Sequence, residues 1–138
     1  MSKRYLLDTN IISHMMRETA GTASRNFAAA TAADLGCAVV TSAIVLCELR
    51  FGLQRKPNPR LSIALERILT ALEVLPFDVD AVTCYADLRA SLQQLGTPIG
   101  PNDTLIAAHA LALGATLVTD NETEFRRVPG LQVENWLR

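Results

Sequence analysis

The sequence contains two aspartates that stand just after short apolar runs. Asp8 follows residues 5–7, and Asp120 follows residues 115–118 with a single threonine between. Because ligands of open α/β sheets bind beyond the carboxyl ends of the strands, both carboxylates stand where chemistry is expected. An aspartate in that position also commonly caps the next helix or forms a turn, so neither residue identifies a site by itself.

Two further acids lie on predicted helices. The helical neighbours of Glu48, three and four positions away, are all nonpolar, which places its carboxylate at the edge of an apolar stripe. Because an unpaired buried carboxylate is costly, Glu48 either reaches solvent, pairs with Arg50 or Arg55, or belongs to a site. Asp103 lies in the first turn of its helix, where the helix dipole favours an anion in any case.

Taken together, the four acids predict a metal site. If the first strand pairs with the strand at 115–118 and the two acid-bearing helices line the same edge, then Asp8, Glu48, Asp103 and Asp120 converge on one pocket. A single like-charge pair at ~4 Å costs about 4 kcal/mol at an effective dielectric of about 20, so four ionised carboxylates need a divalent cation. No histidine or cysteine stands at ligand spacing, and an all-oxygen set favours Mg²⁺, with Mn²⁺ as its substitute. The alternative is a non-catalytic α/β binding module whose acids only cap helices.

The elements that would position these acids alternate along the whole chain. Strands are predicted at 5–7, 38–41 and 115–118, with a strand-like run at 131–133. Helices are predicted at 9–16, at 43–54 and over a short segment at 122–126. Another helix runs from Thr22 to a stop at Gly36. A further helix begins at Pro59, and two more end at Leu95 and Leu113. Ser42, Asn58, Asp78 and Asn102 are the expected caps. This pattern predicts one α/β domain over residues 1–138, with a mostly parallel sheet covered by helices.

Four segments resemble the acidic motifs of PIN-domain nucleases and, more narrowly, of the VapC toxins of bacterial toxin–antitoxin pairs. They are LDTN from Leu7, ELRFG from Glu48, PNDTLIAA from Pro101 and VTDN from Val118, in family order. The resemblance runs from Tyr5 to about Trp136 and implies a three-layer sandwich with a mostly parallel central sheet. It also implies Mg²⁺-dependent cleavage of RNA, such as tRNA, with Asp8, Glu48, Asp103 and Asp120 as catalytic and metal-binding residues. The fourth motif varies most across the family, with Asn often in place of the acid.

The same resemblance implies a small VapB-type antitoxin as partner and a homodimer that forms a hetero-oligomer with it. A leucine-rich helix at 61–72 supports the dimer, because its apolar stripe exceeds what one core is expected to cover. A DNase or phosphatase with the same acids is the alternative among enzymes.

Composition excludes several other classes of protein. Thirteen Lys and Arg against 14 Asp and Glu give a net charge of −1, so any nucleic-acid binding must be local. Cys37, Cys47 and Cys84 form no C-x-x-C pair, which favours reduced thiols in a cytoplasm over a disulfide framework or zinc site. The apolar stretch at 105–118 is shorter than the ~18 residues that span a bilayer, and no signal peptide precedes the first strand. The sequence therefore predicts a cytoplasmic protein without a membrane segment.

Three further features each admit two interpretations. Glu124 either supports a metal ligand or is a solvated surface acid. The basic stretch that contains Arg50, Arg55, Lys56 and Arg60 either contacts phosphates or is ordinary surface. His14 and His109 have no partner at catalytic spacing, which favours core or surface histidines.

Overall fold

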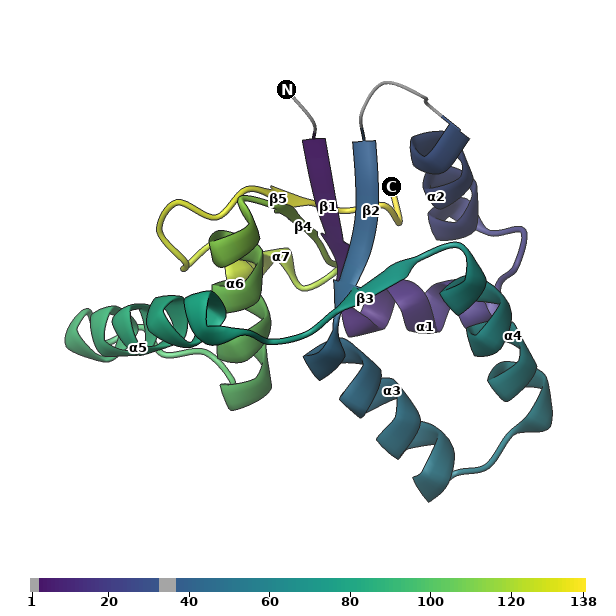
Figure 1. Ribbon diagram of the computed structural model, residues 1–138, viewed down its shortest axis with the longest axis horizontal. Coiled ribbons are helices and arrows are strands. Elements are labelled where there is room, and N and C mark those ends of the chain that lie inside the picture. The colour runs from purple at the N-terminus through teal and green to yellow at the C-terminus, as the bar shows by residue number, and fades with distance from the viewer. Residues whose placement is uncertain (1–2, 33–36) are drawn as a thin grey trace.

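The computed structural model describes residues 3–32 and 37–138, in which short strands and helices alternate (Figure 1). The strands are β1 (Lys3–Leu7), β2 (Cys37–Ser42), β3 (Glu73–Leu75), β4 (Thr116–Val118) and β5 (Val133–Glu134). The helices are α1 (Thr9–Arg17), α2 (Thr22–Ala32), α3 (Ala43–Arg55), α4 (Pro59–Thr70), α5 (Val79–Gln94), α6 (Pro101–Leu113) and α7 (Glu122–Phe125).

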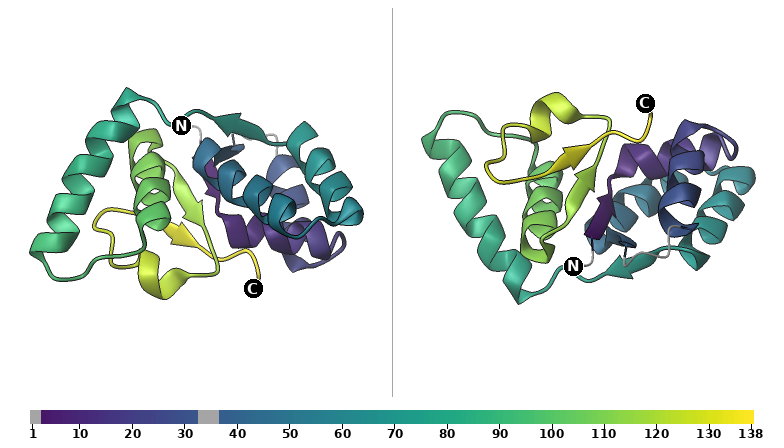
Figure 2. Two further views of the ribbon diagram at one scale, coloured as in Figure 1. Left: turned by 90° about the horizontal axis from the view of Figure 1, so that it is seen from below. Right: turned by 90° about the horizontal axis from the view of Figure 1, so that it is seen from above.

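The strands of the described residues form one parallel sheet in the order β3-β2-β1-β4-β5. Leu7 of the central strand β1 stands opposite Thr41 of β2 and Val118 of β4. Because all the strands run in one direction, the residues that follow β1 and β4 lie side by side at the same edge. Helices α5 and α6 cover one face of the sheet, and α1, α2 and α4 cover the other (Figure 2). The predicted α/β three-layer sandwich is confirmed.

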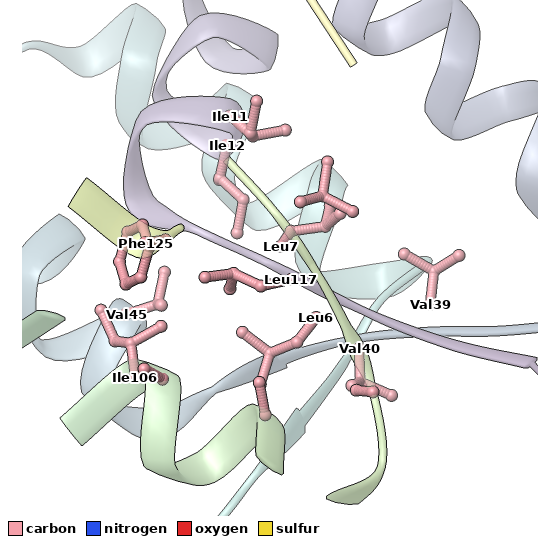
Figure 3. Packing of buried hydrophobic residues seen from close by; sticks show 14 of the residues in the cluster. Leu6, Leu7, Ile11, Ile12, Val39, Val40, Val45, Ile106, Leu117 and Phe125 are labelled. Atoms are coloured by element: carbon pink, nitrogen blue, oxygen red, sulfur yellow. The ribbon is translucent and has the colours of Figure 1, made fainter. Parts of the chain in front are cut away.

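Both faces of the sheet are buried, and this explains why its strands are continuous apolar runs rather than alternating ones. Leu6 and Leu7 are neighbours on β1, so their side chains point to opposite faces, and neither is exposed to solvent. Figure 3 shows both among the buried side chains that pack around the sheet, together with Ile11 of α1 and Ile106 of α6. Asp8, which follows Leu7, is therefore attached to a strand that is packed on both faces.

Side-chain caps begin most of the helices where the sequence predicts them. The side chains of Ser42, Asn58 and Asp78 accept backbone N–H groups in the first turns of α3, α4 and α5. The expected cap at Asn102 was wrong, because α6 begins two residues earlier, with Gly100 as its N-cap and Pro101 in its first turn. Proline suits that position, where its missing N–H has no partner to lose.

The other boundaries differ little from those predicted. Thr22 is the first residue of helix α2, whereas the sequence predicts it as the cap, and the predicted stop at Gly36 lies outside the described residues. The last strand is Val133–Glu134 rather than residues 131–133. Within the described ranges, no helix combines the length and the apolar character that crossing a membrane requires.

The leucine-rich helix is α4, and the core of the same chain covers part of its apolar stripe. In or against that core lie Leu61, Leu65, Ile68, Leu69 and Leu72. Ile63 is the large apolar side chain of α4 that stays exposed. Ile68 is only partly buried and, with Ile63, lines an open apolar groove, so part of this face is not covered by the core and the homodimer stays a prediction.

Candidate active site

Asp8 is fixed at the carboxyl end of β1 by several hydrogen bonds. Its backbone N–H donates to the Val118 carbonyl at 2.9 Å, and its Oδ1 accepts the N–H of Thr9 at 2.7 Å, which caps α1. Its Oδ2 accepts the Thr119 hydroxyl at 2.7 Å. The residue is 3% exposed, and this burial raises the pKa of the Asp8 carboxyl. Asp8 is thus a helix cap and a buried carboxylate at once.

Glu48 reaches the same place from α3. The Thr9 hydroxyl donates to Glu48 Oε1 at 2.6 Å, so one threonine links the carboxylates of β1 and α3. Arg50 instead forms an ion pair with Glu66 on α4. Of the predicted alternatives for Glu48, pairing with Arg50 is therefore excluded, and the half-buried carboxylate faces Asp8.

Asp103 and Glu124 form a pair of carboxyl groups beside Asp8. Burial and then the negative charges of Asp8 and Glu124 raise the pKa of Asp103 to about 7. Glu124 accepts the N–H of Gly100 at 2.8 Å and the side-chain amide of Asn121 at 2.7 Å. These bonds hold the pKa of Glu124 below its usual value, and a hydrogen bond with Asp103 lowers it further. The proton of the pair is therefore held on Asp103.

The acids surround one polar cavity of about 430 Å³ at the carboxyl edge of the sheet. Its walls are formed by Asp8, Thr9, Asn10, Ser13, Arg17, Glu48, Asp103 and Asn121. The predicted convergence of Asp8, Glu48 and Asp103 is thus what the structure shows. These three residues come from β1, α3 and α6, which are far apart in the sequence.

Asp120 lies outside this cavity. Its backbone N–H donates to Asn10 Oδ1 at 3.0 Å, but its side chain is exposed and accepts the amide of Asn135 at 3.0 Å. The charges that raise the pKa of Asp103 come from Asp8, Glu48 and Glu124. Glu124 does not line the cavity either, but it is the fourth acid whose charge acts on the group, and Asp120 as a metal ligand stays a prediction.

The donor set fits a hard divalent cation such as Mg²⁺. Carboxylate, amide and hydroxyl oxygens line the cavity, and burial, followed by the negative charges of the neighbouring acids, raises the pKa of Asp103. Among the residues that the structure describes, no three His, Cys, Asp or Glu side chains are already arranged to hold an ion. Mg²⁺ keeps several waters and takes only one or two carboxylates directly, so it does not require such a preformed group.

Three residues of the cavity wall were missed by the sequence reasoning: Asn10, Ser13 and Arg17. Asn10 Nδ2 lies 3.4 Å from Asp8 Oδ2, and its Oδ1 holds the backbone of Asp120. Thr9, Ser13 and Arg17 recur every four residues on α1. That spacing places them along one side of the helix, and it was a signal present in the sequence.

Replacing Thr119 by Val is expected to weaken both the fold and the site. The fully buried Thr119 hydroxyl donates to Asp8 and accepts the N–H of Asn121 at 3.0 Å. Valine keeps the shape but leaves both partners unpaired, so we expect a loss of about 1–3 kcal/mol in unfolding free energy. Because Thr119 orients Asp8, Mg²⁺ affinity should fall about 10–100-fold. Urea denaturation and Mg²⁺ titration measure the two effects. Thr119→Ser should restore both, and a Val variant equal to the unmodified chain would refute this role.

The remaining candidates have structural roles. His109 is buried, its Nδ1 lies 2.8 Å from Ser42 Oγ, and burial lowers its pKa, so it is a core histidine as predicted. Cys47 and Cys84 are free thiols. The cytoplasmic location stays a prediction.

Comparison with known proteins places this arrangement in context. The family model described as "PIN domain" matches residues 5–131. Ribonuclease VapC2 of Rickettsia felis is 38% identical over 133 residues, which cover 96% of this chain and 97% of that protein. The tRNA(fMet)-specific endonuclease VapC of Shigella flexneri is 33% identical over 134 residues, which cover 96% and 98%.

Solved structures show the same fold. VapBC2 from Rickettsia felis, bound to a DNA fragment from its promoter, has a TM-score of 0.88 and 36% identity. The match covers 96% of this chain and 98% of that one. VapBC-1 from nontypeable Haemophilus influenzae has a TM-score of 0.83 at 33% identity and covers 98% and 99%.

Proposed function

Because the chain belongs to the PIN-domain family and, within it, to the VapC ribonucleases, we propose that it is a Mg²⁺-dependent endoribonuclease and the toxin of a toxin–antitoxin pair. The observation that carries this proposal is the cavity in which Asp8, Glu48 and Asp103 meet from three separate elements. Helix caps scattered over a binding module have no reason to share one cavity and raise each other's pKa.

Each residue of the cavity has a role in this proposal. Asp8 and Asp103 hold the ion directly, and Glu48 binds it directly or through a water. Bound Mg²⁺ activates a water molecule and stabilises the charge that develops on the scissile phosphate. Thr9 and Thr119 hold the Glu48 and Asp8 carboxylates by the hydrogen bonds described above. Attack by water leaves a 5′-phosphate and a 3′-hydroxyl on the RNA.

The substrate class is RNA, with tRNA as the first candidate. The relative in Shigella flexneri is named as specific for tRNA(fMet), and this supports a structured RNA here. Hydrolysis by a metal-activated water needs no 2′-hydroxyl, so the preference for RNA over DNA must come from binding.

Sequencing of RNA 5′ ends after brief expression of the chain tests the proposal. The expected result is a small set of new 5′ ends that accumulate together with growth arrest. The Asp103→Asn variant, expressed to the same level, should produce neither. New 5′ ends that appear equally with this variant would overturn the site, and their absence with the unmodified chain would overturn the activity.

Millimolar Mg²⁺ or Mn²⁺ is expected to raise the melting temperature. An ion that binds only the folded chain stabilises it by about 2.7 kcal/mol at 100 times its dissociation constant. The Asp8→Asn variant should lose most of this gain, whereas Asp87→Asn on the exposed side of α5 should keep it. Scanning calorimetry with and without EDTA measures the shift. A gain of the same size in Asp8→Asn would contradict the site.

A VapB-type antitoxin is the proposed partner, since the solved relatives are VapBC complexes. The molecule has an apolar groove of about 600 Å³, larger than the acidic cavity and separate from it. It is lined mainly by apolar side chains of α1, α2 and α4, among them Met15, Met16, Phe27, Ile63 and Ile68. A groove of this kind suits an apolar segment of a partner. The homodimer is a proposal that light scattering of the purified chain tests.

A further inference from the structure

Arg17 is the arginine that lines the acidic cavity, and it does so without an acidic partner among the described residues. Among the described residues, Arg50, Arg126 and Arg138 form ion pairs with acids. No ion pair or hydrogen bond of the Arg17 guanidinium is found, although Arg17 lines the cavity that contains Asp8, Glu48 and Asp103. It is the basic side chain of that cavity wall, and it is exposed to solvent.

The place of Arg17 on α1 sets its distance from the acids. Thr9 touches Glu48, Ser13 lies one turn further along the wall, and Arg17 lies one turn beyond that. At 1.5 Å per residue, Arg17 stands roughly 12 Å along the helix from Thr9. A guanidinium there is outside the carboxylate cluster but within reach of a strand that crosses it.

A second arginine meets Arg17 at this end of α1. Arg60, in the first turn of α4, has its Nη2 at 3.4 Å from the backbone carbonyl of Arg17. Arg60 belongs to the basic stretch singled out in the sequence, and it has no acidic partner in the described part of the chain. It lines the apolar groove next to α1 rather than the acidic cavity, so it stands further from the acids than Arg17 does. Figure 1 shows α1 and α4 next to each other on the same face of the sheet, and their packing brings the two arginines together.

A structural role at the end of the helix does not account for Arg17. A cation in the last turn of a helix is favourable, and His14 and Arg17 both occupy that turn of α1. The favourable interaction of a cation with the helix terminus does not depend on the side of the helix from which the side chain projects. Arg17 nevertheless lies on the side that carries Thr9 and Ser13, where it borders the acidic cavity.

We propose that Arg17 binds the RNA phosphate next to the scissile one, and that Arg60 binds the phosphate beyond it. Guanidinium groups recognise phosphates by two parallel hydrogen bonds, and phosphate contacts set the register of a strand without reading its bases. The net charge of −1 rules out attraction by the molecule as a whole, so a local pair of arginines is the kind of contact the strand requires. The inference rests on the proposed ribonuclease function. Arg17 is then a substrate-positioning residue at the entrance of the cavity.

Steady-state cleavage of an oligoribonucleotide that spans a mapped cut site tests the proposal. Arg17→Gln should raise KM about tenfold while kcat changes by less than about twofold, because a uniformly bound phosphate contact is lost. The slope of log(kcat/KM) against log salt concentration should become shallower by about 0.7. Arg17→Lys should recover part of KM, since it keeps the charge but not the paired hydrogen bonds. Arg60→Gln should change KM in the same direction by a smaller factor.

Arg89→Gln is the matched control, because Arg89 is exposed on α5 and its hydrogen bond is to Tyr85 of the same helix. It should leave KM and the salt slope unchanged. An Arg17→Gln variant with the KM and salt slope of the unmodified chain would overturn the proposal. So would a variant in which only the melting temperature falls, or only the affinity for the antitoxin. If the unmodified chain cuts no RNA, the proposed function fails instead.

Discussion

Replacing Asp103 by Asn is expected to abolish RNA cleavage and, in metal-free buffer, to make the protein more stable. The two effects have one cause. Burial, and then the negative charges of the neighbouring acids Asp8, Glu124 and Glu48, raise the pKa of Asp103, and such surroundings would favour a cation. Asparagine keeps the shape of the side chain but removes the charge, so repulsion is relieved and a metal ligand is lost. We expect a loss of at least about 100-fold in kcat/KM, as for a group acting directly in catalysis.

The stability gain should depend on pH in a direction that the pKa fixes. The pKa of Asp103 is about 7 in the folded protein against an ordinary value of 3.8, so the folded state binds its proton more tightly than the unfolded state. Stability therefore falls as the pH rises from about 4 towards about 7, and the full penalty is present above that range. Relative to the unmodified chain, Asp103→Asn should gain little at pH ~4 and, after allowance for solvent screening, on the order of 1–2 kcal/mol at pH ~8.

Urea denaturation in EDTA at both pH values measures this difference. Asp87→Asn on α5 serves as the control for loss of one negative charge, and it should show no such gain. An Asp103→Asn variant that cleaves RNA normally would refute its role as a ligand. An Asp103→Asn variant that is less stable than the unmodified chain at the higher pH would refute the claim that the surroundings of Asp103 disfavour its negative charge.

Glu124→Gln is expected to reduce cleavage much more than Asp120→Asn. Glu124 accepts hydrogen bonds from Asp103, Gly100 and Asn121. Glutamine removes the charge and turns one acceptor into a donor, which then faces the amide of Asn121. Because such a change would displace the Asp103 carboxyl, which is proposed to bind the metal, we expect a loss of about 10–100-fold in kcat/KM.

The Asp120→Asn variant is the matched comparison, because it removes one carboxylate from the same turn. Its side chain faces Asn135 in solvent, so we expect a change of less than about threefold, as for surface contacts in general. Cleavage assays of the two variants in parallel show which of the two acids contributes more to activity. The opposite order of effects would return Asp120 to the set of metal ligands.

The choice between these two acids shows where reasoning from the sequence reaches its limit. Asp120 was selected because it closely follows an apolar strand. In the structure the ladder extends one residue further, since the N–H of Thr119 donates to the Glu134 carbonyl at 2.9 Å. Successive residues of an extended chain point to opposite sides, so Thr119 turns inward to Asp8 and Asp120 turns out to solvent. Which of two successive residues points inward depends on where the strand ends, and a short apolar run in the sequence does not show that position.

Other parts of the site could be predicted because they depend on local sequence. Asp8 follows a strand that is apolar on both faces, and the nonpolar neighbours of Glu48 indicate a carboxylate that is not simply in solvent. That β1 and β4 are neighbours was only a condition of the prediction, because the order of parallel strands is set by crossovers and not by the strands themselves. The sequence could not predict that Arg17 and Arg60 lie close together, since they are 43 positions apart and only the packing of α1 on α4 brings them together.

RNA cleavage by the purified chain during a Mg²⁺ titration tests the central claim most directly. After treatment with EDTA the protein should cut no RNA, and millimolar Mg²⁺ should restore cleavage with products that carry a 5′-phosphate. Asp8→Asn, assayed in the same titration, should stay inactive at every Mg²⁺ concentration. Cleavage that continues at full rate in EDTA, or that Asp8→Asn performs as well as the unmodified chain, would contradict a metal-dependent nuclease site in this cavity.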